Sequence, residues 1–340
     1  MAEPLFPTRA LVTGSRGFAG RHLSALLRAA GCEVWGLDLG PGTPAPAAGA
    51  AAAEAAPAEV GPGAAHERTG DVLDFERVRA CVEEARPEVV FHLAARTAPR
   101  PTGPFDHRLF EVNVLGTRVV LEAVLAAGAK SRVLVTSSSA IYGAPPRAAQ
   151  PIAEDAPAAP QTLYAASKFA QETLALVYHR SHGVPVVVTR AFNHTGPGER
   201  PEFAASGFAR QLAEIEQGGG AARVRVGNLE AVRDIADVRD VVRGYVAAGL
   251  RGEPGGCYNV CSGVPRRMAE VLDGLRALCH RPVEVEIDPD RLQPSDVPYQ
   301  CGTFARLEAE TGWRPEIPFA RTLADLLDDW RRIVAGGRQT

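Results

Sequence analysis

A short apolar run that breaks into three evenly spaced glycines is the strongest constraint on how this chain can fold. Residues 8–13 (TRALVT) form the run, and Gly14, Gly17 and Gly20 follow it with the spacing G-x-x-G-x-x-G. A helical pattern of leucines comes next, and a second apolar run, Glu33–Asp38, ends in an acidic residue. This order of elements predicts a Rossmann βαβ unit, in which glycines let the backbone approach a pyrophosphate at the helix N-terminus.

The alternation of apolar runs and helical patterns continues through the first half of the chain. We expect further strands ending at Asp71-Val72 and covering 89–95, 133–137 and 184–189, and helices over 74–85, 106–127 and 161–182. Near-continuous apolar strands separated by helices are typical of a parallel sheet buried on both faces, with its functional residues at the C-terminal strand ends. The predicted fold class is therefore α/β, a Rossmann-type doubly wound parallel sheet.

The alternation loosens after residue 190, where we expect a change of domain. Helices are predicted over 203–217, 238–249, 266–279 and 319–336, with short strands between them. Residues 1–190 are thus predicted to bind a dinucleotide, and residues 191–340 mainly to form a smaller α/β lobe for a second ligand. An Ala/Pro/Gly-rich segment, 41–65, is interpreted as a flexible surface insertion, because such residues cannot build a core.

A hydroxyl cluster and a Tyr-x-x-x-Lys pair form a candidate acid/base apparatus. Three serines, Ser137 to Ser139, end a predicted strand, and Tyr164 and Lys168 follow on a predicted helix. Positions i and i+4 share one helical face, so the two side chains can point into one cleft. An ammonium, or an oxidised nicotinamide, lowers the pKa of a tyrosine from its usual value near 10. The pair alone would be an ordinary helix pair, but this chain also supplies a dinucleotide turn.

Composition excludes several classes of function. The net charge of -3 gives no electrostatic basis for binding nucleic acid or an anionic membrane. The chain has no signal-peptide pattern at its start and no apolar run of about 18 residues. Six scattered cysteines without a CxxC pair indicate free thiols in a reducing compartment, not a metal site or disulfides. We therefore expect a cytoplasmic protein without a metal.

Eight motifs in the same order resemble those of the extended short-chain dehydrogenases/reductases that act on nucleotide sugars. They are TGSRGFAG (13–20), Asp38, GDV (70–72), HLAA (92–95), VNVLGT (112–117), TSSSAIYG (136–143), YAASK (164–168) and TGWRPEIP (311–318). The second half is similar to the branch acting on GDP-mannose derivatives, through RAFNHTGPG (190–198), VGNLEAVRDIADVRDVV (226–242) and YNVCSG (258–263). That branch includes GDP-mannose 4,6-dehydratases and GDP-4-keto-6-deoxy-D-mannose reductases, and LQPSDVP before CGTFARLEAETGWRPEIP resembles the reductases somewhat more.

One position separates these activities. Dehydratases of this branch carry a glutamate two residues before the Tyr-Gly of the strand-five loop, and this chain has Ala140 there. A methyl group cannot move a proton, and Glu154 and Asp155 lie in a Pro/Ala-rich loop. The resemblance therefore implies reduction of a GDP-4-keto-6-deoxyhexose, with an NAD-dependent nucleotide-sugar 4-epimerase as the alternative. A cofactor sensor without catalysis is disfavoured, because Ser138, Tyr164 and Lys168 are all present.

The resemblance also implies a role for each residue. Tyr164 would donate a proton to the sugar carbonyl, Ser138 and Ser139 would hydrogen-bond the same region of the substrate, and Lys168 would bind the nicotinamide ribose. Asn193 would lie near the sugar diphosphate and Arg233 would contact the diphosphate or the nucleotide, whereas His92 and His194 are expected to be structural. Together with Tyr164 and Lys168, the implied cofactor contacts are Gly14, Ser15, Arg16, Gly17, Phe18, Gly20, Asp38, Asp71, Val72, Leu93, Ala94, Ala95 and Asn113.

The identity of the cofactor and of the sugar stays open. Asp38 would repel a 2′-phosphate and favours NAD(H), while Arg16 could pair with that phosphate and leaves NADP(H) possible. The reductase-like motif often has Arg where this chain has Gln293, Ile235-Ala236 replaces the usual Phe-Thr, and the loop 97–108 departs from the family pattern. The sugar is therefore expected to be unusual. Family members commonly dimerise through the two helices expected here over 106–127 and 161–182.

Overall fold

The computed structural model describes residues 5–40, 64–97, 107–218, 222–292 and 297–336. The insertion predicted at 41–65 lies outside these residues except for its last two, and Gln293 lies outside them as well. Among the described residues, no helix combines the length and the apolar character needed to cross a bilayer. All six cysteines are free thiols.

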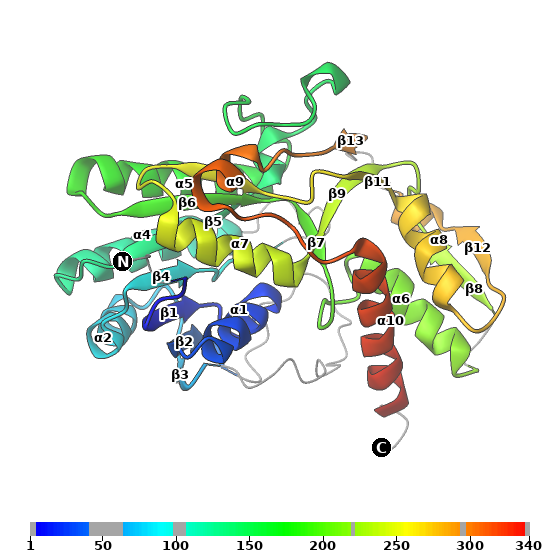
Figure 1. Ribbon diagram of the computed structural model, residues 1–340, viewed down its shortest axis with the longest axis horizontal. Coiled ribbons are helices and arrows are strands. Elements are labelled where there is room, and N and C mark those ends of the chain that lie inside the picture. Colours follow the sequence, from blue (N-terminus) through cyan, green and yellow to red (C-terminus); the bar gives the residue numbers. More distant parts are fainter. Residues whose placement is uncertain (1–4, 41–63, 98–106, 219–221, 293–296, 337–340) are drawn as a thin grey trace.

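A parallel sheet of seven strands lies at one side of the molecule, opposite the lobe with α8 (Met268–Leu278) and α10 (Phe319–Gly336) (Figure 1). Its first strands begin as predicted, but β3 ends at Thr69, so the expected ending at Asp71-Val72 is wrong. The cause is a turn in which the Asp71 carboxylate accepts a hydrogen bond from Leu73 N at 3.0 Å. Across the sheet the order is β10 (Cys257–Val260), β6 (Val186–Ala191), β5 (Arg132–Ser138), β4 (Val89–His92), β1 (Arg9–Thr13), β2 (Glu33–Asp38) and β3 (His66–Thr69).

Helices cover both faces of this sheet, which confirms the doubly wound α/β prediction. Along β5, Leu134 packs into one core and its neighbours Val133 and Val135 pack into the other. One face carries α1 (Phe18–Ala29) and α7 (Val238–Arg251), and the other carries α2 (Phe75–Ala85), α4 (Gly116–Ala126) and α5 (Leu163–His182). The strand order reverses between β4 and β1, and ligands bind at such switch points in open α/β sheets.

The long helix predicted over 106–127 is helical but not uniform. It consists of α3 (His107–Phe110), a π-helical turn (Glu111–Leu115) and α4. Asn113 sits in the π turn and is fully buried. Such turns are rare and occur frequently at functional sites, so the irregularity marks Asn113 as a residue whose orientation matters.

The second half of the chain builds a smaller lobe around its own apolar core (Figure 1). The four helices expected there are present as α6 (Ala204–Glu216), α7, α8 (Met268–Leu278) and α10 (Phe319–Gly336), and the structure adds α9 (Ala305–Thr311). The lobe's strands form two small sheets. In the first, β9 (Val232–Asp237) pairs with β7 (Asn193–Thr195), β11 (Pro265–Arg267) and β13 (Tyr299–Gln300); in the second, β8 (Arg223–Val226) pairs with β12 (Glu284–Ile287). From this half, α7 and β10 return to the central sheet.

A buried ion pair fixes α5 against the sheet. Arg190 of β6 and Glu172 of α5 approach to 2.5 Å, with side chains 10% and 2% exposed. The Arg190 guanidinium also donates to Tyr142 Oη at 2.8 Å and to the Glu154 carbonyl at 2.7 Å. Tyr142 in turn donates to Asn259 Oδ1 at 2.8 Å. These contacts join α5, the loop after β5, β6 and β10.

We predict that Glu172→Gln lowers the free energy of unfolding by about 3 kcal/mol, because it leaves the Arg190 cation buried without its counter-ion. The matched control is Glu214→Gln, which breaks the exposed pair of Glu214 with Arg210 and should cost less than about 1 kcal/mol. Urea unfolding of both variants measures the difference. Equal effects would contradict the assignment of Arg190–Glu172 as the anchor of α5.

Candidate active site

The glycine turn between β1 and α1 is a close-packed cradle. Gly14 has a φ of +73° and donates from its N–H to Leu37 O at 2.8 Å. A Cβ at Gly14 would lie 2.7 Å from Ala94 N, and one at Gly20 would lie 2.0 Å from Gly14 O. Only glycine fits these two places. The turn therefore brings backbone N–H groups to the N-terminus of α1, which suits a pyrophosphate.

Two carboxylates lie beside the glycine turn, one at the end of β2 and one within β3. Asp38 accepts hydrogen bonds from Arg16 N at 3.0 Å and from Leu39 N at 2.8 Å. Glu67 accepts a hydrogen bond from Ser15 Oγ at 3.2 Å and lies 3.4 Å from the Arg16 guanidinium. The Arg16 side chain is thus already paired with a carboxylate, and the Ser15 hydroxyl faces inward. Glu67 had no signal in the sequence, because it lies in a short strand without a motif.

The expected cofactor contacts beyond this turn lie on neighbouring strand ends. Leu93 N and Ala94 N donate to Thr13 O at 3.1 Å and to Thr13 Oγ1 at 3.3 Å. Val72 lies against Gly116, where an added Cβ would meet its Cγ1 at 2.8 Å. The loop after β4, with Ala95, and the turn at Asp71 thus border the C-terminal edge of the sheet on either side of the glycine turn.

A buried hydrogen-bond network orders the start of α5. Asn113 Nδ2 donates to Ser167 Oγ at 2.9 Å and to Arg96 O at 3.1 Å, while its Oδ1 accepts from Arg96 N at 2.8 Å. Ser167 Oγ donates to Tyr164 O at 2.8 Å. The π turn therefore orients Asn113 so that it joins the loop after β4 to the backbone of Tyr164. Neither Arg96 nor Ser167 was singled out from the sequence.

The predicted triad comes together at the end of β5. Burial raises the pKa of Tyr164 above its ordinary value, and a hydrogen bond with Ser138 acts in the opposite direction. Burial also lowers the pKa of Lys168 to about 7, opposed by the Glu172 carboxylate. The sequence predicts that the lysine lowers the pKa of Tyr164, but the net shift is upward because desolvation outweighs the effect of Ser138. Tyr164 is therefore held as a phenol, a proton donor at neutral pH.

His92 lies behind this triad and has no free nitrogen. Its Nδ1 is 2.7 Å from Thr13 Oγ1 and its Nε2 is 2.9 Å from Thr117 Oγ1. Burial lowers the pKa of His92 to about 3, with the Lys168 charge as a smaller cause. A neutral imidazole bound to two hydroxyls connects β1, β4 and α4, which fits the structural role expected for it.

The two residues expected near the sugar diphosphate, Asn193 and Arg233, lie on β7 and β9 of the second lobe. Ser138 is the register partner of Ala191, so Asn193, two residues further and exposed, begins β7 beside the triad. Arg233 is the register partner of Gln300, whose amide donates to Ser139 O at 3.0 Å. Gln300 thus joins the triad loop to β9, a link that the sequence did not reveal. The Ser139 hydroxyl donates to Gln300 Oε1 at 3.2 Å, so it supports the loop.

The two lobes also meet at the glycine turn. The rings of Phe18 and His194 are stacked with centroids 5.8 Å apart. His22 Nε2 lies 2.9 Å from Pro197 O, and Arg21 donates to Gly198 O at 3.2 Å. The loop that carries Asn193 is therefore attached directly to the first turns of α1, with His194 in the structural role expected for it.

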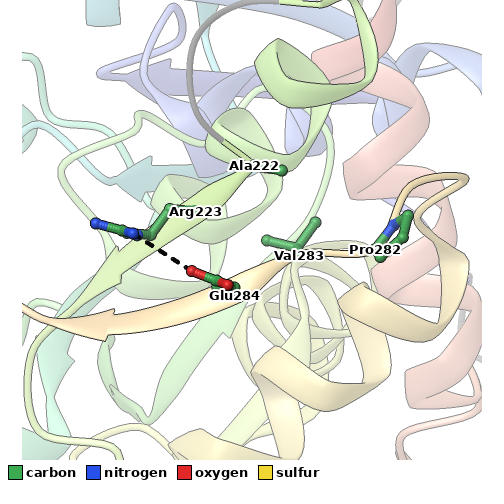
Figure 2. Close-up of a pocket in the computed structure, with 5 residues that line it drawn as sticks. All are labelled: Ala222, Arg223, Pro282, Val283 and Glu284. Atoms are coloured by element: carbon green, nitrogen blue, oxygen red, sulfur yellow. Dashed lines mark hydrogen bonds and ion pairs between the residues drawn. The ribbon is translucent and has the colours of Figure 1, made fainter.

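A separate hollow of about 400 Å³ lies in the second lobe (Figure 2). It is lined by Ala222, Arg223, Pro282, Val283 and Glu284, around the start of β8 and β12. Figure 1 places these strands at the far end of the molecule from α5. The candidate active site is therefore the triad with the glycine turn and not this hollow.

A family model, a relative and two solved structures each match nearly the whole length of this chain. A family model described as GDP-mannose 4,6 dehydratase matches residues 11–326. GDP-6-deoxy-D-mannose reductase of Pseudomonas aeruginosa is 34% identical over 326 residues, 96% of this chain and 98% of its own. The structure of RMD from Pseudomonas aeruginosa complexed with NADPH has a TM-score of 0.81 and 32% identity, covering 96% of this chain and 99% of that one. UDP-glucose 4-epimerase of Thermus thermophilus, complexed with NAD, has a TM-score of 0.81 and 30% identity, covering 95% and 99%.

We predict that Gly20→Ala weakens binding of a reduced nicotinamide dinucleotide by at least about 10-fold, because the added methyl displaces the Gly14 carbonyl and the turn around it. Gly336→Ala is the matched control, since a Cβ there meets none of the described residues within 4 Å. Fluorescence titration with NADH and NADPH measures both. Unchanged binding by Gly20→Ala would show that the dinucleotide does not lie on this turn.

Proposed function

The chain belongs to the GDP-mannose 4,6-dehydratase family within the extended short-chain dehydrogenases/reductases, and on that premise we propose that it reduces the 4-keto group of a GDP-4-keto-6-deoxyhexose. The observation that carries the proposal is that Ser138, at the end of β5, acts on Tyr164 of α5, with Lys168 one helical turn further on, while Ala140 stands in place of an acid/base residue. Glu154 does not replace that residue, since its carboxylate accepts from Asn259 N at 2.7 Å. The reductase from Pseudomonas aeruginosa supports the choice of substrate.

Each residue at the site has a separate role in the proposed reaction. A bound nicotinamide supplies the hydride. Tyr164 donates its phenolic proton to the carbonyl oxygen, Ser138 hydrogen-bonds that oxygen, and Lys168 holds the nicotinamide ribose and stabilises the phenolate that remains. Asn193 and Arg233 bind the diphosphate; a guanidinium can donate two parallel hydrogen bonds to it. The glycine turn and strand-end contacts described above hold the dinucleotide.

A nucleotide-sugar 4-epimerase is the second candidate, because the epimerase of Thermus thermophilus shares this fold over nearly its whole length. An epimerase would keep its NAD through purification and would show no net consumption of cofactor. The reductase is favoured because the comparison with GDP-6-deoxy-D-mannose reductase has the higher identity.

We also propose that NAD(H) is preferred over NADP(H). Asp38 at the end of β2 and Glu67 within β3 place two carboxylates beside the glycine turn, and Arg16 is paired with Glu67. A 2′-phosphate there would meet negative charge, while Asp38 can accept hydrogen bonds from ribose hydroxyls. RMD from Pseudomonas aeruginosa was solved with NADPH and the epimerase of Thermus thermophilus with NAD.

We also propose how the chain is divided into domains and where the protein is located. Residues 1–190 would form the dinucleotide domain and 191–340 mainly the nucleotide-sugar lobe, with α7 and β10 completing the central sheet. Six free thiols fit a cytoplasmic location.

A homodimer would form through the helices within 106–127 and 161–182. Six large apolar side chains are exposed there: Phe110, Leu115, Leu125, Leu163, Phe169 and Val177.

Tyr164→Phe is expected to lower kcat by at least about 10³-fold, because the ring stays but no proton can be donated. Binding of the reduced cofactor should change by less than about 2-fold. Consumption of NADH with GDP-4-keto-6-deoxymannose and fluorescence titration measure the two effects. A variant that retains wild-type turnover would reject Tyr164 as the proton donor.

Asp38→Asn is expected to raise kcat/KM for NADPH relative to NADH by about 10-fold, since it removes one negative charge from the ribose site. Glu88→Gln, which changes an exposed carboxylate that bonds Thr8, is the control and should leave the ratio unchanged. Initial rates with each cofactor give the ratio. A wild-type enzyme that prefers NADPH would contradict the assignment of Asp38.

The proposed dimer predicts a mass of twice the 36.0 kDa chain in light scattering after gel filtration. Phe169→Arg should give a monomer, because a guanidinium would be buried without a partner in the interface. Leu292→Arg, at an exposed leucine of the second lobe, should stay dimeric. A monomeric wild-type protein would exclude the interface.

A further inference from the structure

Gln171, in the middle of α5, is fully buried and has no hydrogen-bond partner in the part of the chain that the structure describes. Its side chain is 0% exposed, and neither Nε2 nor Oε1 bonds to a described residue. The hydroxyl of Ser137, on β5, is a second buried group of this kind. Unpaired polar groups are costly inside proteins, and internal water molecules usually satisfy them.

The two groups lie in the same layer between α5 and the sheet. Ser137 has the same orientation along β5 as Val133 and Val135, which belong to the core that includes Ala175 of α5. Gln171 precedes Ala175 by one helical turn and shares its face. Ser137 is also the register partner of Arg190, whose guanidinium binds Glu172, the neighbour of Gln171. The strand register and the ion pair therefore place both groups on the side of the sheet that α5 covers, in the layer around the Arg190–Glu172 pair.

Lys168 shares this face, one turn before Gln171, and its side chain is buried. The titratable and charged groups around it are Tyr164 and Glu172 on α5, His92 on β4 and Arg190 on β6. The Glu172 carboxylate is already bound by Arg190 through Nε and Nη2. Among the described residues, the carboxylate that acts on Lys168 is therefore one that Arg190 already binds, although the proposed chemistry requires the lysine as an ammonium.

We propose that Gln171 and Ser137 bind an internal water molecule that accepts a hydrogen bond from the Lys168 ammonium. The water would donate its two hydrogens to Gln171 Oε1 and Ser137 Oγ, which gives it three partners in a polar site. Such a water hydrates the ammonium inside the protein and favours its charged form. Gln171 and Ser137 are then positioning residues that act through Lys168. Only the kinetic consequence of this water rests on the proposed function.

The chain offers a direct readout, because Lys130 and Lys168 are its only lysines. In the full-length protein labelled with ¹³C-lysine, NMR titration follows both side chains, and the exposed Lys130 is an internal reference. Gln171→Leu should move the titration midpoint of Lys168 to lower pH by about one unit or more, because it removes a water partner. Ser137→Ala should move it in the same direction.

Ser24→Ala is the matched control, because it removes another unpaired buried hydroxyl, on α1, and should leave Lys168 unchanged. A crystal structure of the wild type should show a water within hydrogen-bonding distance of Gln171 and Lys168, and Gln171→Leu should lack it. If Gln171→Leu does not fold, Ser137→Ala carries the test. The proposal would be overturned if the titration midpoint of Lys168 in the folded variants equalled that of the wild type. It would also be overturned if the wild-type crystal structure showed no water between Gln171 and Lys168.

The pH dependence of activity should shift in the same direction as the titration midpoint of Lys168. Loss of the ammonium as pH rises should end activity, so the alkaline limb of kcat/KM should shift to lower pH in Gln171→Leu, by about as much as the Lys168 midpoint. An unshifted limb beside a shifted midpoint would overturn the link from this water to catalysis. Absence of any turnover in the wild type, with the NMR shift intact, would reject the proposed function and leave the water site standing.

Discussion

The attachment of α5 to the sheet is the interaction on which the rest of this structure depends. The buried Arg190–Glu172 pair fixes the middle of the helix, and the bond from Asn113 to Ser167 fixes its first turns. Tyr164 and Lys168 lie on the stretch of helix that these two attachments hold. Because both side chains are desolvated there, the tyrosine remains a phenol and the lysine titrates near neutral pH. The acid/base properties of the site thus follow from how the helix packs.

The same packing connects the two halves of the chain. Gln300 bonds to Ser139 O and pairs in register with Arg233, while the stacked rings of Phe18 and His194 join the glycine turn to the loop of Asn193. The cofactor side and the substrate side are therefore attached to the triad through short, direct contacts. A nucleotide sugar held by the second lobe would lie with its sugar at the C-terminal edge of the central sheet.

Local pattern predicted most of the architecture. Apolar runs gave the parallel sheet because strands buried on both faces need them, and β2 has the predicted bounds Glu33–Asp38. The strand expected to end at Asp71-Val72 ends earlier, because a side-chain turn replaces the ladder at Asp71. The partners Glu67, Gln300 and Arg96, and the π turn at Asn113, were not predicted. They depend on contacts between distant segments, about which a local pattern carries no information.

The central claim is net hydride transfer to carbon 4 of a nucleotide sugar, and isotope tracing tests it most directly. The wild-type protein is incubated with GDP-4-keto-6-deoxymannose and NADH carrying deuterium at nicotinamide C4, each stereoisomer in turn. We expect one of the two stereoisomers to give one deuterium at sugar C4 per cofactor oxidised, located by NMR of the purified GDP-sugar. Interconversion of nucleotide sugars without cofactor oxidation or incorporated label would contradict it and favour the epimerase.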